Sequence, residues 1–435
     1  MHPEVQISVF VKKTSNDSTM FSYNSDLNLP PASTLKLLST GLAFQKLGSQ
    51  FRFKSNIILN GQLNEGIFTG KIIIDTQSDP SFGSKRFNLN PEREIILALK
   101  NKEIKAVKGD IEIITDNNTF KVPLSWQIGD IGNYFGAFPM RFNFDENIVS
   151  YYFDAKNMEG QSADLVKTEP LASNWEIINQ VKIGPRNSGD QVNVISIPGN
   201  NTIILIGSIP AGARSFKIKG ANPTPALTFK ENLKTELLKN QISFNQEIPN
   251  DSLLSKFDTL TVLESPKLED IITECNHKSV NFFADGLGVY LTELENSDFE
   301  SFYRLKAKER DINFSKTHLI DGSGLSASNL ISTRNMCDFL QKLSTMSDFN
   351  SFLKTIPIVG KSGTVKYLDP RNKTNGKIYA KSGTISGVKN YSGYFFDDKN
   401  EIYSFAFYCS GINDTAQSDL RNFTKDFFSK LVEIK

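Results

Sequence analysis

The stretch Pro31-Ala32-Ser33-Thr34-Leu35-Lys36 determines how the rest of the sequence is interpreted. It opens a helical pattern that the sequence predicts to end at Gly48. Ser33 and Lys36 stand three residues apart at the first turn of this helix, so their side chains share one face. A lysine beside a serine can serve as its base where burial and nearby positive charge lower the pKa of the amine. The pair therefore predicts a nucleophile that is activated without histidine.

This spacing alone is not specific, because Ser351-Phe352-Leu353-Lys354 and Ser386-Gly387-Val388-Lys389 share it. What distinguishes Ser33 is the order of the elements that follow it. Ser279-Val280-Asn281 comes next, and Lys381-Ser382-Gly383-Thr384 comes third. Active-site serine penicillin-recognising enzymes have three such elements in this order.

Ser-x-Asn also occurs at Ser22-Tyr23-Asn24 and Ser243-Phe244-Asn245. We favour Ser279 because a helical run begins there, whereas Ser243 lies in a strand-like run. The Ser279 hydroxyl could relay a proton between Lys36 and a leaving amine, and the Asn281 amide could hold a substrate amide. Alternatively, Ser279 only caps a helix.

The element Lys-Ser-Gly-Thr occurs twice, at Lys361 and at Lys381. Such a motif belongs on an edge strand beside the serine, where a glycine leaves room for the substrate backbone. Lys381 ends a strand-like run and a glycine-punctuated hairpin follows it, whereas the surroundings of Lys361 are typical of a loop. We therefore predict that Lys381, Ser382, Gly383 and Thr384 bind the substrate. The Lys381 ammonium would pair with a carboxylate, and the backbone N–H groups of Ser33 and Thr384 would form an oxyanion hole.

The composition supports a folded protein of several domains. The chain has 435 residues, of which 39% are hydrophobic and 22% charged, and its formal charge of +1 gives no general attraction for nucleic acid. Three cysteines and three histidines form no Cys-x-x-Cys or His-x-x-x-His pair, so we expect neither a metal nor another cofactor. No run of about 18 apolar residues predicts a transmembrane segment.

The pattern along the chain predicts an α+β fold whose sheet uses both chain ends. An N-terminal hairpin precedes the Ser33 helix, and residues 51–147 read as antiparallel β. Helices follow, and then three strand-like runs near residues 377–381, 391–396 and 402–409 lead into a C-terminal helix.

At this point the chain resembles the low-molecular-mass class C penicillin-binding proteins over nearly all its length. Pro31-Ala32-Ser33-Thr34-Leu35-Lys36 and His277-Lys278-Ser279-Val280-Asn281 are similar to two of their motifs. Asp321-Gly322-Ser323-Gly324-Leu325-Ser326 and Gly109-Asp110 resemble two further signatures. The resemblance implies a penicillin-binding transpeptidase-like or β-lactamase-like domain that carries two inserted, mainly β domains. The domains expected are residues 1–62 with 256–435 for catalysis, 63–147 with 198–255, and 148–197 nested within the second.

Two departures from the family pattern affect the proposed site. Val280 stands where the family commonly has Asp or Asn, and Ser382 replaces the commoner Thr but keeps its hydroxyl. Residues 126–137 resemble a segment that faces the side-chain amine of the substrate in some members. The resemblance thus implies that Asp130 binds an ammonium group, although a surface Asp in a turn is the alternative.

The family consists of D-alanyl-D-alanine carboxypeptidases and endopeptidases that act on peptidoglycan stem peptides. The resemblance implies that Lys36 takes the proton of Ser33, that Ser33 is acylated, and that Ser279 protonates the leaving D-amino acid. Penicillins should acylate Ser33. The expected location is periplasmic or otherwise extracytoplasmic, with a signal peptide removed; the oligomeric state stays open. The alternatives are a serine β-lactamase or esterase of the same superfamily and a catalytically silent cell-wall-binding protein.

Overall fold

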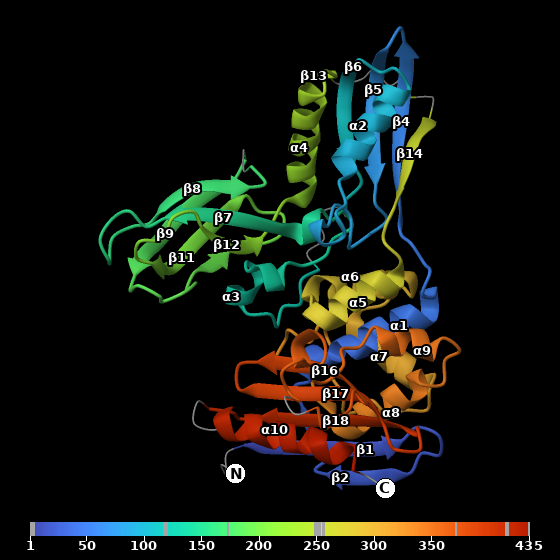
Figure 1. Cartoon of the computed structure of the whole chain (residues 1–435). Coiled ribbons are helices and arrows are strands. Elements are labelled where there is room, and N and C mark those ends of the chain that lie inside the picture. Colours follow the sequence, from blue (N-terminus) through green and yellow to red (C-terminus); the bar gives the residue numbers. More distant parts are fainter. Residues whose placement is uncertain are drawn as a thin grey trace. The chain divides into compact units, whose positions relative to one another are not determined.

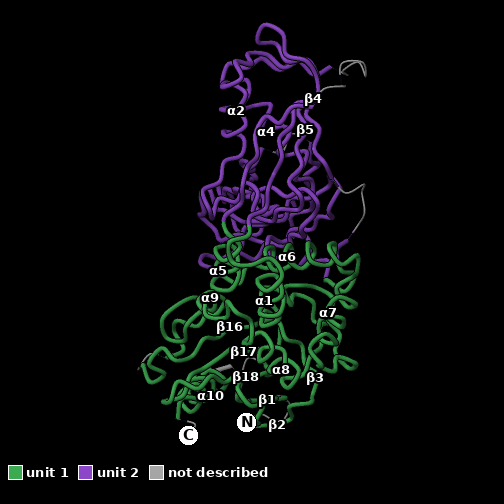
Figure 2. The backbone as a smooth tube through the Cα atoms, turned by 90° about the vertical axis from the view of Figure 1, so that its right-hand side faces the viewer, with its two compact units in different colours: residues 1–51, 123–126, 267–435 green, residues 52–122, 127–266 purple. Residues whose placement is uncertain are grey.

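The computed structural model describes residues 5–115, 121–171, 174–247, 254, 257–369, 372–413 and 417–433. The chain divides into two compact units, residues 1–51, 123–126 and 267–435, and residues 52–122 and 127–266 (Figure 2). The first unit contains β1 (Gln6–Lys13), β2 (Thr19–Tyr23), β3 (Asn28–Leu29), α1 (Lys36–Leu47), α5 (Leu268–Lys278), α6 (Asn281–Leu294), α7 (Phe299–Lys308), β15 (Ile331–Ser332), α8 (Thr333–Leu343), α9 (Phe349–Lys354), β16 (Ile378–Ile385), β17 (Val388–Phe396), β18 (Ile402–Ser410) and α10 (Gln417–Leu431). The second contains β4 (Lys54–Asn64), β5 (Ile67–Asp75), α2 (Pro91–Asn101), β6 (Ala106–Ile113), α3 (Ile128–Ile131), β7 (Ile148–Asp154), β8 (Asp164–Glu169), β9 (Glu176–Gly184), β10 (Asn193–Ile195), β11 (Thr202–Pro210), β12 (Phe216–Ala221), α4 (Pro225–Lys239), β13 (Ser243–Gln246) and β14 (Phe257–Glu264).

The first unit is built around a five-stranded sheet to which both ends of the chain contribute (Figure 1). Its strand order is β16-β17-β18-β1-β2. β1 pairs antiparallel with β18 along its whole length, from Gln6 opposite Ser410 to Lys13 opposite Tyr403. β16 forms one edge of the sheet. The predicted α+β fold is thereby confirmed, with the two chain ends meeting at the centre of the sheet.

Helices cover both faces of this sheet. On one face, Phe405 and Phe407 of β18 share a core with Phe428 of α10. On the other face, the Ser404 hydroxyl donates to the Cys337 carbonyl of α8. Because successive residues of a strand point to opposite faces, α10 and α8 pack on opposite sides. None of the helices in the described ranges is long and apolar enough to cross a bilayer.

The second unit contains a mixed sheet rather than the antiparallel one that the sequence predicts for residues 51–147. The order is β13-β6-β5-β4-β14, and β5 pairs parallel with β6. Parallel neighbours need a crossover, and α2 supplies it. The sequence reading missed this helix, although Asn90 caps it, Pro91 opens it and three apolar residues form its buried face. The family signature at Gly109 has a local structural cause here, because a Cβ on it would lie 1.7 Å from the Gly70 carbonyl oxygen.

A separate core in the second unit lies between two three-stranded sheets, β12-β7-β8 and β10-β11-β9. β11 pairs parallel with β9, and β12 pairs antiparallel with β7. Strands on both sides of residue 197 therefore share one core. The division of the chain into three domains at the expected boundaries stays a prediction.

Residues 123–126 return from the inserted part of the chain to the first unit. The Trp126 Nε1–H donates to Asp321 Oδ2 at 2.9 Å, and the hydroxyls of Ser125 and Ser326 lie 2.9 Å apart. Asp321 is fully buried, and its carboxyl also accepts from the backbone N–H of Gly324 and of Ser326 and from the Asn329 side chain. Trp126 therefore completes the shell of donors around a buried carboxyl.

We predict that Trp126→Phe lowers the free energy of unfolding of the protein by about 1–3 kcal/mol, because it leaves a buried acceptor short of one donor. Trp175→Phe is the matched control. Trp175 is half-buried and its Nε1–H donates to the Thr224 hydroxyl, so its loss should have a smaller effect. Urea unfolding followed by circular dichroism measures both variants. Equal losses for the two would show that the Asp321 contact has no special weight.

Candidate active site

Ser33 lies in a strained turn directly before α1. It belongs to a 3₁₀ turn over Ala32–Leu35, and its side chain is half-buried. Ala32 has φ +46°, a left-handed conformation that is unfavourable for a residue with a Cβ. The Asp321-Gly322-Ser323-Gly324 turn packs on this strained residue, and a Cβ on Gly324 would lie 1.9 Å from the Ala32 carbonyl oxygen. The glycine therefore allows the two turns to touch, which the sequence pattern alone did not reveal.

Lys36 is the first residue of α1, and its side chain is fully buried beneath Ser33. Its Nζ donates to Ser33 Oγ at 2.8 Å, to Asn281 Oδ1 at 2.7 Å and to the Ser323 carbonyl oxygen at 2.7 Å. Burial lowers the pKa of the Lys36 amine, and the charges of Asp285 and Asp321 oppose that shift. The amine is thus held within reach of the serine hydroxyl under conditions that favour its neutral form.

Ser279 and Asn281 lie at the junction of α5 and α6. Ser279 ends α5 in a left-handed conformation with φ +56°, and Val280, not Ser279, occupies the N-cap position of α6. The alternative that Ser279 serves as a helix N-cap is therefore wrong. The largely buried Val280 lies between the two side chains that reach toward the lysines.

The third element lies on β16, at the edge of the sheet. Lys381 is fully buried, and its Nζ donates to Ser279 Oγ at 2.8 Å and to the Ser382 carbonyl oxygen at 2.7 Å. Burial holds the pKa of Lys381 well below its usual range, and the positive charge of Lys36 adds to that shift. A Cβ on Gly383 would lie 3.0 Å from the Ser33 nitrogen. Glycine is therefore needed for the contact with the serine turn, in addition to any need for substrate space.

The hydroxyls of Ser382 and Thr384 each contact a side chain that the sequence reading did not assign to the site. Ser382 Oγ lies 2.7 Å from Thr364 Oγ1, which belongs to the other Lys-Ser-Gly-Thr element, the one that begins at Lys361. Thr384 Oγ1 accepts from Lys389 Nζ at 2.9 Å. Thr364 lies in a short 3₁₀ turn over Gly363–Val365, so the element at Lys361 occupies a loop, as predicted. This loop nevertheless touches β16, the strand that carries the Lys381 element.

Two carboxyl groups lie beneath the site: Asp321, which the sequence placed in a family signature, and Asp285, which the sequence analysis missed. Asp285 is fully buried on α6 and accepts from the Gly322 N–H at 2.9 Å. Burial, followed by the charge of Asp321, raises the pKa of Asp285 to about 8. Together Asp285 and Asp321 hold the turn whose Ser323 carbonyl accepts from Lys36. For Asp285, the only signal in the sequence was a carboxyl group among the apolar residues of its helix.

Asp130 is the one candidate site residue that belongs to the second unit. It lies on α3 of the second unit and is half-buried, and burial raises the pKa of its carboxyl. Its assignment to ammonium binding stays a prediction. Cys275, beneath the lysines, is fully buried, which raises the pKa of its thiol to about 12 and leaves it protonated. Within the described part of the chain, no group of three His, Cys, Asp or Glu side chains is arranged to hold a metal ion.

Comparison with known proteins agrees with this arrangement. The D-Ala-D-Ala carboxypeptidase 3 (S13) family model matches residues 2–431. The D-alanyl-D-alanine carboxypeptidase DacB of Haemophilus influenzae is 25% identical over 97% of this chain and 88% of its own length.

Solved structures show the same fold. Penicillin-binding protein 4 of H. influenzae matches with a TM-score of 0.83 and 23% identity, covering 99% of this chain and 97% of that one. A predatory endopeptidase of Bdellovibrio bacteriovorus matches with a TM-score of 0.57 and 16% identity, covering 99% and 93%. The family match spans nearly the whole sequence and contains all three elements around Ser33, so the chain belongs to the D-Ala-D-Ala carboxypeptidase 3 (S13) family of serine peptidases.

Proposed function

We propose that this member of the family hydrolyses the D-Ala-D-Ala end, or the D-Ala cross-link, of peptidoglycan stem peptides through an acyl-enzyme on Ser33. The observation that carries this proposal is the contact of 2.8 Å between Lys36 Nζ and Ser33 Oγ. Burial lowers the pKa of that lysine, which favours the neutral amine that can accept the serine proton. A general base in hydrogen-bond reach of a nucleophile is the minimal machinery for acyl transfer.

In the first half-reaction, Lys36 takes the proton of Ser33 and the Ser33 oxygen attacks the carbonyl of the penultimate D-Ala. The backbone N–H groups of Ser33 and Thr384 hold the developing oxyanion, for which the close packing of Gly383 against the Ser33 turn provides support. As the peptide C–N bond breaks, Ser279 gives its proton to the leaving amine and is reprotonated by the proton that Lys36 took from Ser33. Water then hydrolyses the ester and restores Ser33.

Binding of the substrate involves the remaining assigned side chains. Lys381 is held by Ser279 and by the Ser382 carbonyl, which supports a role for this strand in placing the substrate carboxylate beside the proton donor. Asn281 accepts from Lys36 through Oδ1, so an amide at this position can hold the lysine and a substrate amide together. Ser382 and Thr384 supply hydroxyls on the same strand, and Asp130 supplies a carboxylate for a side-chain ammonium.

Relatives support the substrate class and the inhibitor class. The DacB relative of H. influenzae is a D-alanyl-D-alanine carboxypeptidase, and the penicillin-binding protein 4 of that organism has been solved in complex with a β-lactam. The Bdellovibrio protein is an endopeptidase. We infer that this chain accepts penicillins at Ser33 and that it works outside the cytoplasmic membrane, where its substrate is found.

We predict that Ser33→Ala abolishes D-Ala release from diacetyl-Lys-D-Ala-D-Ala and also abolishes the penicillin adduct. Intact-protein mass spectrometry after brief penicillin exposure, with the modified peptide mapped, measures the adduct. Ser351→Ala is the matched control, because Ser351 has the same spacing to a lysine on α9 and should leave both signals intact. An adduct on another residue would refute the site.

Rapid release of hydrolysed penicillin in place of a lasting adduct would indicate a β-lactamase. The absence of both D-Ala release and a penicillin adduct would indicate a catalytically silent wall-binding protein.

We predict that the acylation rate rises with pH as Lys36 loses its proton, with a midpoint below the ordinary lysine pKa of about 10.4 because the amine is buried. Lys36→Arg, which stays protonated, should slow acylation about 10²–10⁴-fold and remove this rise. A fluorescent penicillin followed from pH 5 to 10 measures the rate, with Lys354→Arg as the control. A variant that keeps the wild-type pH profile would show that another group is the base.

A further inference from the structure

A pocket of about 340 Å³ lies beside the end of β16, among the described residues of the first unit. Its polar lining comes from Thr364, Thr384, Lys389 and Arg421, and Leu368 and Leu420 contribute apolar surface. The volume is at the lower end of the range for small-molecule sites. The pocket joins five parts of the chain, namely the loop of the Lys361 element, strands β16 and β17, the segment after β18 at Ile412, and helix α10.

The pocket is continuous with the proposed substrate strand. Thr384 stands opposite Lys389 in the β16–β17 register and accepts from its ammonium. The Ser382 hydroxyl contacts Thr364, which lines the pocket. Gly383, between these two residues, faces the Ser33 turn. Because alternate residues of a strand point to opposite sides, β16 has the Ser33 turn on one face and this pocket on the other, so a substrate held along its edge can reach both.

The charges in the pocket are positive and have no carboxylate partner. Lys389 and Arg421 form no ion pair with any acidic side chain in the ranges that the structure describes. Lys389 is half-buried, and burial lowers the pKa of its amine. A carboxylate that entered the pocket would therefore stabilise the charged form of this amine. Arg421 presents a guanidinium, whose fork of donors matches a carboxylate.

The direction of the proposed reaction decides which part of the substrate lies here. Ser279, the proposed donor to the leaving amine, contacts Lys381, and Lys381 contacts the Ser382 carbonyl. The leaving group therefore lies at the Ser382 end of the site. We propose, on the basis of the function proposed above, that the pocket is a subsite for a second carboxylate, carried by a leaving group larger than D-Ala. Such a leaving group is what an endopeptidase releases, namely the rest of a second peptide.

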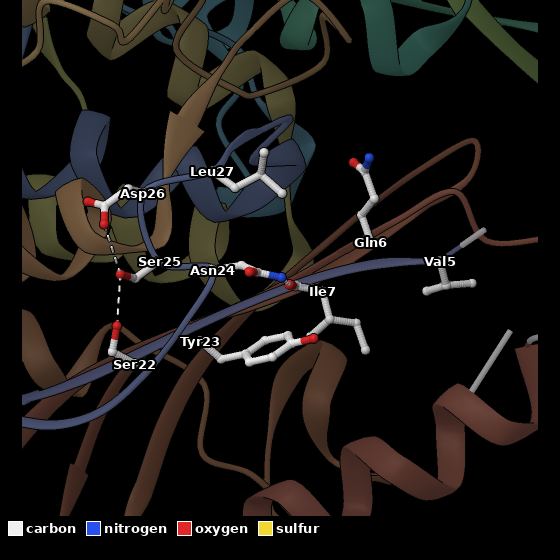
Figure 3. A pocket seen from close by; sticks show the side chains of 9 residues that line it. All are labelled: Val5, Gln6, Ile7, Ser22, Tyr23, Asn24, Ser25, Asp26 and Leu27. Carbon is white, nitrogen blue, oxygen red and sulfur yellow. Dashed lines mark hydrogen bonds between the residues drawn. The ribbon is translucent and has the colours of Figure 1, made fainter. Parts of the chain in front are cut away.

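A larger hollow, of about 660 Å³, lies at the opposite edge of the same sheet, between β1 and the segment that follows β2 (Figure 3). Three of its polar side chains already pair with one another, because Ser22 donates to Ser25 and Ser25 donates to Asp26 (Figure 3). It borders neither β16 nor the Ser33 turn. The pocket at Lys389 and Arg421 is therefore the better candidate for a substrate subsite.

The test compares three acetylated peptides that end in D-Ala-D-Ala, D-Ala-D-Glu and D-Ala-D-Gln. The D-Glu and D-Gln leaving groups have the same shape and differ only in the side-chain charge. We expect kcat/KM of the wild-type protein to be about tenfold higher for D-Glu than for D-Gln. Arg421→Met and Lys389→Met should each bring this ratio toward one. Lys430→Met, on the same helix but outside the pocket, should keep it.

The outcomes separate the subsite from the reaction itself. A wild-type ratio near one, or a ratio that survives both substitutions, would overturn the subsite. An equal loss on all three peptides, including D-Ala-D-Ala, would place the terminal carboxylate at these cations and would also overturn it. If the wild-type protein hydrolyses none of the peptides and gives no penicillin adduct on Ser33, the proposed function fails, and the subsite fails with it.

Discussion

The rest of the site depends on the hydrogen bonds of the buried Lys36 amine. A lysine without exposure to water is costly unless its protons find acceptors, and here three separate parts of the chain provide one each. Ser33 comes from the turn before α1, Asn281 from the start of α6, and the Ser323 carbonyl from the turn that two buried carboxyls hold in place. The same three contacts that satisfy the amine also bring the reacting groups together, so stability and chemistry are served by one arrangement.

Close backbone contacts give this arrangement its precision. Gly324 lets one turn touch the carbonyl of Ala32, and Gly383 lets β16 pass against the nitrogen of Ser33. The left-handed conformation of Ala32 persists because the surrounding turns leave it no alternative. The strained turn at Ala32 needs both glycines, because a bulkier residue at Gly324 or Gly383 would move Ser33 away from Lys36.

The order of three short elements was enough to predict the fold class and to name candidate residues that the structure joins by hydrogen bonds, Lys36 with Ser33 and Asn281, and Lys381 with Ser279. The two copies of Lys-Ser-Gly-Thr could be told apart because a strand and a loop differ in their flanking patterns. Asp285 and Thr364 could not be found in this way, since their importance comes from distant residues that fold against them. The helix α2 was missed for another reason. Its capping signal at Asn90-Pro91 was present, but the strand-like patterns on both sides of it led to a prediction of continuous β structure.

The pairing of β1 with β18 joins residues that are almost four hundred positions apart. Contacts of such long range are slow to form, because the intervening chain must first be brought to order. The turn that carries Ser33 therefore meets β16 only after synthesis has passed Ile385. A chain cut before residue 378 would lack β16, β17 and β18, and with them Lys381 and the strand against which the Ser33 turn packs.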